Sequence, residues 1–346
     1  MKKRWTLFLA AVLLSGCLAA CGKGNAAPAD DTPEGGMPAG GSTAGGDHTG
    51  DIPAKGEGSS GQAGEDGIYI FTDDLGRQVA VSSHERAAAL LGSYADLWVL
   101  AGGQLVAAPA DAFEDFGLTL SEDTVNLGGT KSLSLELLLA AAPDFVLAST
   151  NTTQHLEWRQ ALEGAGIAVA YFDVACFEDY LRVLKICTGI TGREECCEQY
   201  GEALRKQIDE VLAQCAQKTA PRVLLMRASA ASIRAKGNEG NVLGEMLAAF
   251  GCVNIADTDD SLLENLSIES IVLQNPDKIL VLPVGDDLEA ARQGIEEMFE
   301  ENPIWKELDA VKNGEVYYLD KHLYNLKPNA RWAEAYEKLA EILYEE

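Results

Sequence analysis

The stretch SLELLLAAAPDFVL at residues 134–147 returns in altered form as SIESIVLQNPDKIL at residues 267–280. Each copy has serine, an apolar residue and glutamate, then a short helical run, a Pro-Asp pair and an apolar run typical of a buried strand. Proline ends the helix in each copy, because it cannot extend a helix and it restricts the residue before it. Pro-Asp turns are common before strands, so coincidence is the alternative, but the repeat favours two similar lobes.

Strand and helix signals alternate on both sides of each copy. The expected strands are 69–72, 78–81, 87–91, 105–108, 145–148, 168–171, 222–226, 279–282 and 316–319. The expected helices are 94–101, 133–141, 154–164, 241–250, 267–274, 287–300 and 328–344. Such alternation predicts an α/β fold of two Rossmann-like lobes, with parallel sheets covered by helices on both faces.

A long helical stretch without strand character separates the two series. It covers residues 177–215, and we expect it to break between Gly189 and Gly192. Its second part carries an apolar stripe at helical spacing. This interpretation gives an N-terminal lobe at 67–176, connecting helices at 177–215 and a C-terminal lobe at 216–346.

The first residues are typical of an export signal. Lys2, Lys3 and Arg4 precede an apolar run that is too short to span a bilayer, which takes about 20 residues. The small-residue region then ends in cysteine twice, at Cys17 and at Cys21, and both sites resemble a bacterial lipobox. We predict a signal peptide at 1–20 and lipidation at Cys21; Cys17, an uncleaved anchor or an ordinary secretory signal are the alternatives.

Residues 21–66 are expected to form a lipidated, disordered tether. Of the 45 residues from Gly22 to Asp66, 13 are glycine, and large aliphatic side chains are scarce. Such a composition cannot bury enough apolar surface to offset the entropy of ordering.

The charge of the chain excludes several partners. With 27 basic and 54 acidic residues its net charge is −27. Nucleic acid is excluded, because a protein that neutralises phosphates needs a basic face. Binding to anionic lipid through a polybasic patch is excluded for the same reason, so membrane attachment is expected through the lipid anchor alone.

Four sequence motifs are distributed along the chain, and one of them is the repeat described above. They are FTDDLGR at 71–77, the two Ser-apolar-Glu…Pro-Asp copies, TGR at 191–193, and NPIW at 302–305 followed by VKNGEVY at 311–317. Together they resemble the substrate-binding proteins of ABC importers for ferric siderophores, haem and cobalamin, over residues 68–346. The resemblance implies two α/β lobes joined by one long helix, with the ligand in the cleft between them.

The resemblance also implies two docking residues. Proteins of this family use one glutamate on each lobe to enter arginine pockets of the permease, and the motif positions correspond to Glu136 and Glu269. Carboxylates on separate rigid lobes are suited to bidentate contacts with arginine. The alternative is purely local, because each glutamate lies in the first turn of a helix, where negative charge is favoured.

Ligand residues are expected beyond the carboxyl ends of the strands, where paired α/β lobes bind their ligands. The candidates are Ser93, Tyr94, Thr150, Asn151, His155, Arg227, His322, Tyr324 and Arg331. Tyrosine can cover flat rings and arginine can pair with carboxylates. If the cargo is haem, Tyr94 and His155 are the candidate iron ligands. Arg331 lies inside the final predicted helix, where it could support the loop instead of touching ligand.

No resident metal or cofactor is expected. The folded region offers only His84, His155 and His322, too few for a bare zinc or manganese site. The cysteines after Cys21 are interpreted as small buried apolar residues, with a Cys215–Cys252 disulfide as the alternative.

These features predict a monomeric, extracytoplasmic, lipid-anchored binding protein that captures an iron or cobalt chelate and delivers it to an ABC permease. It is not expected to be an enzyme: the sequence has no nucleophile elbow, P-loop or dinucleotide fingerprint. A two-lobe metal-dependent enzyme and a surface scaffold or adhesin are the alternatives. The sequence does not choose among siderophore, haem and cobalamin.

Overall fold

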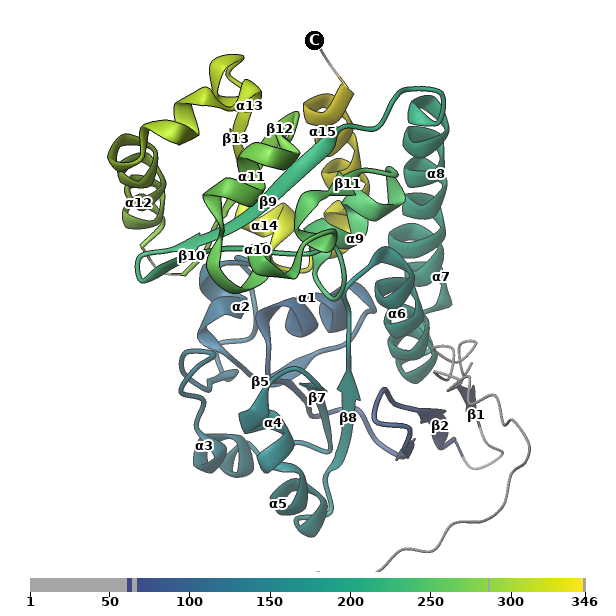
Figure 1. Ribbon diagram of the computed structural model, residues 1–346. Helices are drawn as coiled ribbons and strands as arrows, with labels where there is room; N and C mark the ends of the chain where they lie inside the picture. The colour runs from purple at the N-terminus through teal and green to yellow at the C-terminus, as the bar shows by residue number, and fades with distance from the viewer. Residues whose placement is uncertain (1–60, 64–66, 286, 345–346) are drawn as a thin grey trace, which may run out of the picture. The chain divides into compact units, whose positions relative to one another are not determined.

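The computed structural model describes residues 61–63, 67–285 and 287–344 (Figure 1). The predicted signal peptide, both lipidation candidates and most of the predicted tether lie outside these residues. The described chain contains two α/β lobes, a helical connection between them in sequence and a small antiparallel sheet.

Five parallel strands form the sheet of the first lobe, in the order β6–β5–β4–β7–β8. Their bounds are β4 (Ala87–Ala89), β5 (Leu105–Ala108), β6 (Val125–Asn126), β7 (Phe145–Ser149) and β8 (Ala168–Phe172). Every residue of β7 is buried, as expected for a parallel strand covered on both faces. The lobe's helices are α1 (Gly92–Leu100), α2 (Ala110–Glu114), α3 (Leu135–Ala140), α4 (Thr153–Glu157) and α5 (Arg159–Gly164).

A small antiparallel sheet precedes the first lobe in sequence. It consists of β1 (Gln62–Ala63), β2 (Tyr69–Thr72) and β3 (Gln78–Val81), and the last two have the predicted bounds. Because residues 62–63 pair with β2, the prediction that all of 21–66 is disordered is wrong at this point. Backbone hydrogen bonds to the edge of β2 can order the segment without apolar side chains.

The connection consists of α6 (Phe177–Thr191), α7 (Glu194–Cys197), the π-helical turn η1 (Glu198–Glu202) and α8 (Ala203–Cys215). Helix α6 ends at Gly192, inside the predicted break, and the φ of 68° at Gly192 is one that glycine adopts easily. Figure 1 shows α6 beside the column formed by α7 and α8.

The second sheet is parallel except for one strand. Strand β9 pairs with β11 and β12 in parallel, and β12 pairs with β13 in the same way. Strand β10, which the sequence analysis did not anticipate, runs antiparallel to β9. The bounds are β9 (Arg222–Ser229), β10 (Ser232–Ala235), β11 (Val253–Asn254), β12 (Lys278–Pro283) and β13 (Val316–Tyr318).

Helices of the second lobe are short apart from α12 and α15. They are α9 (Val242–Ala249), η2 (Ile255–Asp257), α10 (Asp260–Asn265), α11 (Ile268–Gln274), α12 (Leu288–Glu301), η3 (Pro303–Glu307), α13 (Asp309–Lys312), α14 (Lys321–Tyr324), η4 (Asn329–Arg331) and α15 (Trp332–Tyr344). The predicted helix at 328–344 thus starts as a 3₁₀ turn and becomes α-helical at Trp332.

The repeated Pro-Asp pair has the same structural role in both lobes. The N–H of Asp144 donates to the carbonyl oxygen of Arg86, and its carboxylate accepts the N–H of Arg86 at 3.2 and 3.3 Å. Asp277 makes the same reciprocal pair with Arg222, at 2.8 and 2.7 Å. Each pair joins the amino ends of two neighbouring strands, β7 with β4 and β12 with β9. The sequence repeat is therefore also a structural repeat.

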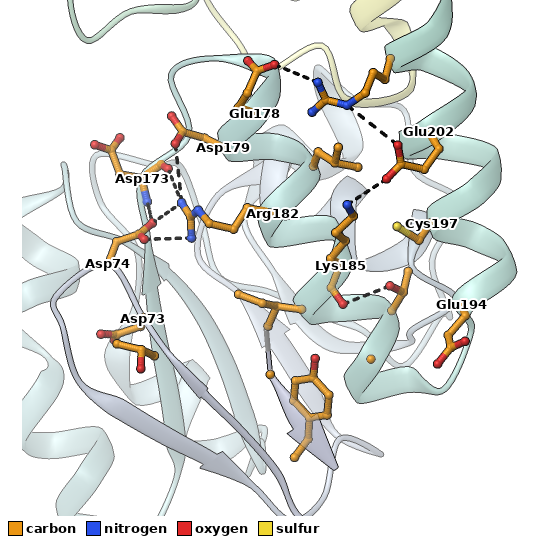
Figure 2. Close-up of a pocket in the computed structure, with 18 of the residues that line it drawn as sticks. Asp73, Asp74, Asp173, Glu178, Asp179, Arg182, Lys185, Glu194, Cys197 and Glu202 are labelled. Carbon is orange, nitrogen blue, oxygen red and sulfur yellow. Dashed lines mark hydrogen bonds and ion pairs between the residues drawn. The ribbon is translucent and has the colours of Figure 1, made fainter. Parts of the chain in front are cut away.

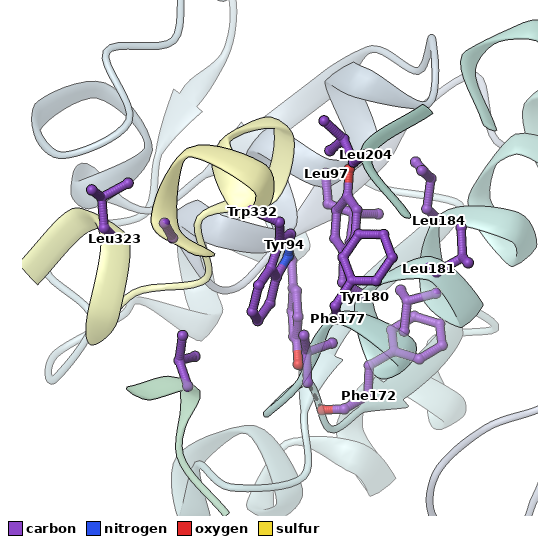
Figure 3. Close-up of a cluster of buried hydrophobic side chains, with 14 of the residues drawn as sticks. Tyr94, Leu97, Phe172, Phe177, Tyr180, Leu181, Leu184, Leu204, Leu323 and Trp332 are labelled. Atoms are coloured by element: carbon purple, nitrogen blue, oxygen red, sulfur yellow. Dashed lines mark hydrogen bonds between the residues drawn. The ribbon is translucent and has the colours of Figure 1, made fainter. Parts of the chain in front are cut away.

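Both lobes contribute to one large hydrophobic cluster (Figure 3). Tyr94 belongs to the first lobe, Phe177 and Tyr180 to α6, and Trp332 to α15. The ring centroid of Trp332 lies 6.0 Å from that of Phe177 and 6.2 Å from that of Tyr180. Two smaller clusters lie on the other faces of the two sheets.

Candidate functional site

Four predicted ligand residues follow strands of the first lobe, and they differ in exposure. Ser93 and Tyr94, on α1, are only 5% and 1% exposed. Thr150 and Asn151 follow β7; Thr150 is half-buried and Asn151 is exposed. Of the four, the last two are therefore open to a ligand.

Tyr94 lies in the core. Its hydroxyl donates to the carbonyl oxygen of Phe172 at 2.7 Å, and its ring meets the Phe172 ring edge-on at a centroid distance of 6.2 Å. Burial raises the pKa of Tyr94, so the phenol stays protonated. Tyrosine ligates iron as a phenolate, and this hydroxyl is both buried and committed to a carbonyl. Tyr94 therefore packs in the core, and its hydroxyl is not accessible as an iron ligand.

His155 is also buried, with no exposed side-chain surface. Its Nδ1 accepts the N–H of Ser149 at 3.1 Å, and its backbone carbonyl accepts the Tyr171 hydroxyl at 2.8 Å. Accepting a hydrogen bond at Nδ1 places the proton of the neutral ring on Nε2, which has no hydrogen-bond partner among the described residues. The ring of His155 thus stabilises the turn after β7 from the protein interior. Because the ring is buried, it is not accessible as an iron ligand.

The burial of His155 predicts a loss of stability in mild acid. Desolvation lowers the pKa of His155 from 6.5 to about 4. Between these two pH values the unfolded chain binds a proton at this imidazole, whereas the folded chain does not. The contribution of the neutral His155 to the free energy of unfolding is fully present above pH 6.5 and is lost as the pH falls towards 4. Between pH 7 and 4.5 the loss amounts to roughly 2–3 kcal/mol. Urea denaturation at the two pH values should show a smaller difference for His155→Gln than for the wild type. His84→Gln is the control and should keep the wild-type difference; an unchanged difference in His155→Gln would contradict the assignment.

Three of the predicted second-lobe residues follow β13, and one of these three is buried. Tyr324 is 3% exposed, and its hydroxyl donates to the carbonyl oxygen of Ala335 at 3.1 Å. His322 is partly exposed, and its Nδ1 lies 2.9 Å from Asp320 Oδ1. Arg331 is exposed and forms two hydrogen bonds with Glu334, at 2.7 and 3.0 Å, so its guanidinium is occupied by a residue of the following helix α15.

Polar contacts join the segment after β13 to the first lobe, and the sequence analysis missed them. Lys321 Nζ lies 2.7 Å from Asp115 Oδ1. Asn329 donates to the carbonyl oxygen of Ser93 and to Asp96 Oδ2, both at 2.8 Å. These partners are more than 200 residues apart in sequence, so no local pattern could have identified them.

Lys327 lies at the same junction. Its Nζ is 5.7 Å from the centre of the Tyr94 ring. Burial lowers the pKa of Lys327, while the charges of Asp173 and Asp111 oppose this shift. Oδ2 of Asp111 accepts the N–H of Gly92 at 3.0 Å, whereas Oδ1 is buried without a hydrogen-bond partner among the described residues.

Arg227 is an exposed residue near the carboxyl end of β9. Its side chain makes no hydrogen bond or ion pair with any residue in the described ranges. Partial enclosure lowers the pKa of Arg227 by desolvation. Of the predicted ligand residues, Arg227 is thus the cation that is free to meet an anion.

A cavity of about 1400 Å³ lies between the β2–β3 turn and the helices α6 and η1 (Figure 2). Of the predicted ligand residues, Thr150 lines it. At its edge both carboxylate oxygens of Asp74 lie 2.9 Å from Arg182, and Asp74 also accepts the N–H of Asp173 at 2.6 Å. Burial raises the pKa of Asp74, and Arg182 and the Asp173 N–H oppose that shift. Nothing in the sequence indicated this cavity.

The two predicted docking glutamates are exposed residues in equivalent positions. Glu136 lies in the first turn of α3, which is capped by Ser134 through a 3.2 Å hydrogen bond from the N–H of Leu137. Glu269 lies in the first turn of α11, which Ser267 caps in the same way. Both helices also expose large apolar side chains: Leu137 and Leu139 on α3 are 43% and 38% exposed, and Val272 and Leu273 on α11 are 40% and 87% exposed.

Within the described residues, no three His, Cys, Asp or Glu side chains lie close enough together to hold a metal ion. Cys215 and Cys252 are free thiols, so the alternative disulfide is not formed. None of the helices in the described part of the chain is both long and apolar enough to span a bilayer.

The fold and these residues define a class of two-lobe α/β binding proteins, and sequence comparison identifies the family. The sequence pattern of the periplasmic binding proteins matches residues 88–323, which extend from β4 to α14. The chain belongs to this family. Its members are binding proteins, which agrees with the prediction that the chain is not an enzyme.

Two curated relatives match in part. The high-affinity heme uptake system protein IsdE of Staphylococcus aureus MRSA252 is 28% identical over 130 residues, which are 38% of this chain and 44% of IsdE. YhfQ of Bacillus subtilis 168, whose name describes an ABC transporter substrate-binding lipoprotein, is 26% identical over 220 residues. That match covers 60% of this chain and 66% of YhfQ.

Solved structures share the fold. An ABC transporter substrate-binding protein from Listeria monocytogenes EGD-e is 25% identical, with a TM-score of 0.63 over 76% of this chain and all of that one. Staphylococcus aureus SirA complexed with staphyloferrin B is 22% identical, with a TM-score of 0.60 over 80% of this chain and 97% of SirA.

Proposed function

We propose that this protein is an extracytoplasmic substrate-binding lipoprotein, monomeric, that captures an iron or cobalt chelate and delivers it to an ABC permease. The observation that carries this proposal is the family match, which extends over both lobes. Two proteins similar to this chain support an iron-chelate cargo, because IsdE is named for haem uptake and SirA was solved with a siderophore.

We propose that cargo binds through the accessible residues on either side of the lobe junction. These are Thr150 and Asn151 in the first lobe and Arg227 and His322 in the second. Ser93, Tyr94 and Tyr324 are covered, so their contribution is to position the loops that carry the accessible residues. His155 acts in the same indirect way. Arg331 contributes once its contact with Glu334 is exchanged for one with ligand.

Titration with coloured probes tests the proposed cargo. Purified protein lacking residues 1–20 is mixed with haemin, a ferric citrate complex, ferrichrome and cyanocobalamin, each followed by absorbance and by tryptophan fluorescence. We expect saturable 1:1 binding of at least one probe without chemical change. Failure of all four to bind, or conversion of a probe into product, would contradict the proposed function.

We propose that Glu136 and Glu269 dock to cationic pockets of the permease, and that the apolar residues beside them complete the contact. An arginine–carboxylate pair is strongest in bidentate geometry, and each glutamate projects from a short, capped helix on its own lobe. The neighbouring exposed leucines would be covered when the complex forms, which adds apolar burial to the charge contact.

Removing both glutamates should separate transport from binding. We expect Glu136→Ala combined with Glu269→Ala to lower cellular uptake of the bound chelate at least tenfold, since each charged contact contributes about 1.5–3 kcal/mol. The affinity of the purified protein for its ligand should not change. Glu157→Ala combined with Glu289→Ala removes two other exposed glutamates, one from each lobe, and should leave uptake intact. Wild-type uptake in the docking variant would overturn the assignment.

We propose a lipid anchor at Cys21, preceded by the signal peptide and followed by the tether. The lipobox-like residues before Cys21 support this assignment. Mass spectrometry of the N-terminal peptide of protein expressed in bacteria should find a diacylated cysteine at position 21. An acylated Cys17, or an unmodified N-terminus, would contradict it, and Cys21→Ser should release the protein from the membrane fraction.

A further inference from the structure

One segment of this acidic chain contains no acidic residue. Between Glu210 and Glu239 the sequence has five basic side chains and no Asp or Glu. In a chain with twice as many acidic as basic residues, such a segment is a marked departure. It contains the hairpin formed by β9 and β10.

Two arginines of this hairpin lie directly opposite each other. The antiparallel register pairs Arg227 on β9 with Arg234 on β10. Opposite residues of an antiparallel pair have Cβ atoms about 4.5–5.5 Å apart, and like charges in this position are destabilising. Lys236 follows Arg234 at strand spacing, and its N–H donates to the carbonyl oxygen of Leu225, so the three cations share one face.

The alternation of buried residues identifies that face. On β9, Leu224 and Met226 belong to the core cluster under α12, whereas Val223 and Leu225 belong to the large cluster that both lobes share. Arg227 continues the second series towards the carboxyl end of β9. Parallel α/β sheets bind ligands at that end of their strands.

The burial pattern of strand β10 places its two cations on the same face as Arg227. Ile233 and Ala235 pack with the cluster under α12, so Arg234 and Lys236 point to the opposite face, that of Arg227. All three cations are exposed. They are therefore aligned on the face of the sheet whose buried residues belong to the large cluster that both lobes share.

None of the three side chains has a hydrogen bond or an ion pair within the described part of the chain. Other cations do: Arg182 pairs with Asp74 at 2.9 Å and Lys321 with Asp115 at 2.7 Å. A protein with 54 acidic residues could readily have supplied a partner here. Paired like charges without a counterion are the arrangement that a bound anion would stabilise.

We infer that Arg227, Arg234 and Lys236 form a cationic face that binds the carboxylates of the cargo, so that the cargo is a carboxylate-bearing metal chelate. This inference rests on the proposed function and narrows its ligand class. Planar guanidinium groups match carboxylates in bidentate geometry, whereas an uncharged chelate would leave the repulsion between the arginines in place. Haemin, with its propionates, and citrate-type ferric chelates fit this face; cyanocobalamin and neutral hydroxamate chelates do not.

Charge removal on β10 tests the inference. Protein lacking residues 1–20 is titrated with haemin and ferric citrate as carboxylate probes, and with cyanocobalamin and ferrichrome as neutral probes. We expect the wild type to bind a carboxylate probe most tightly, with an affinity that falls as salt rises. Arg234→Gln combined with Lys236→Gln should raise the Kd for that probe roughly ten- to a hundredfold and flatten its salt dependence.

A matched control removes two cations from the helices that cover the opposite face. Arg292→Gln on α12 combined with Lys306→Gln on η3 causes the same loss of charge and should change the Kd by less than about twofold, as surface charges distant from a site do. Thermal unfolding separates binding from structure: the β10 variant should be at least as stable as the wild type, because the repulsion between the arginines is relieved.

Each outcome bears on one of the two proposals. Tightest binding of a neutral probe by the wild type would overturn the cationic-face inference and leave the proposed function standing. An unchanged Kd in the β10 variant would do the same. If no chelate binds the wild type, the proposed function is wrong and this inference with it.

Discussion

In each lobe an aspartate joins the amino ends of two central strands through one backbone hydrogen bond and one hydrogen bond to its carboxylate, and the register of these strands depends on this contact. Asp144 with Arg86, and Asp277 with Arg222, close the amino ends of adjacent parallel strands. A slip by one residue would turn every side chain of the strand to the other face, so the contact decides which residues are buried. In the second lobe the alternation along β9 puts Leu225 and Arg227 on one face and Met226 on the other, and the register turns the first of these faces to the large cluster.

The shared hydrophobic cluster limits what the site can use. Phe177 and Tyr180 on α6 pack against Trp332 on α15, and Tyr94 of the first lobe belongs to the same cluster, so residues of both lobes and of the connection share one core. Tyr94 and Tyr324 belong to this cluster, and both hydroxyls donate to backbone carbonyls. The predicted ligand residues that remain accessible, among them Thr150, Asn151 and Arg227, lie in loops or at the ends of strands.

Strands with strong local signals could be predicted, whereas site residues whose surroundings are set at long range could not. Strands β2, β3 and β5 have the predicted bounds, because apolar runs between turn residues define them locally. Strand β10 was missed, since the sequence Ser-Ile-Arg-Ala carries little strand signal without its partner β9. His155 was expected on the ligand side, and only the packing of α4 against β7 shows that its ring turns inward.

The sequence by itself determined the alternation of strands and helices, the division into two lobes and the capped first turns that carry Glu136 and Glu269. These features follow from periodicity, proline and capping residues, which act within a few positions along the chain. Tertiary structure decided which polar groups are free. The contact of Asn329 with Asp96, that of Lys321 with Asp115 and the alignment of Arg227 with Arg234 each depend on strand register or lobe packing. A charged side chain is paired when an opposite charge or a hydrogen-bonding group lies close to it in space. The partners of Lys321 and Asn329 are more than 200 residues away in sequence, so their proximity could not be predicted from the sequence alone.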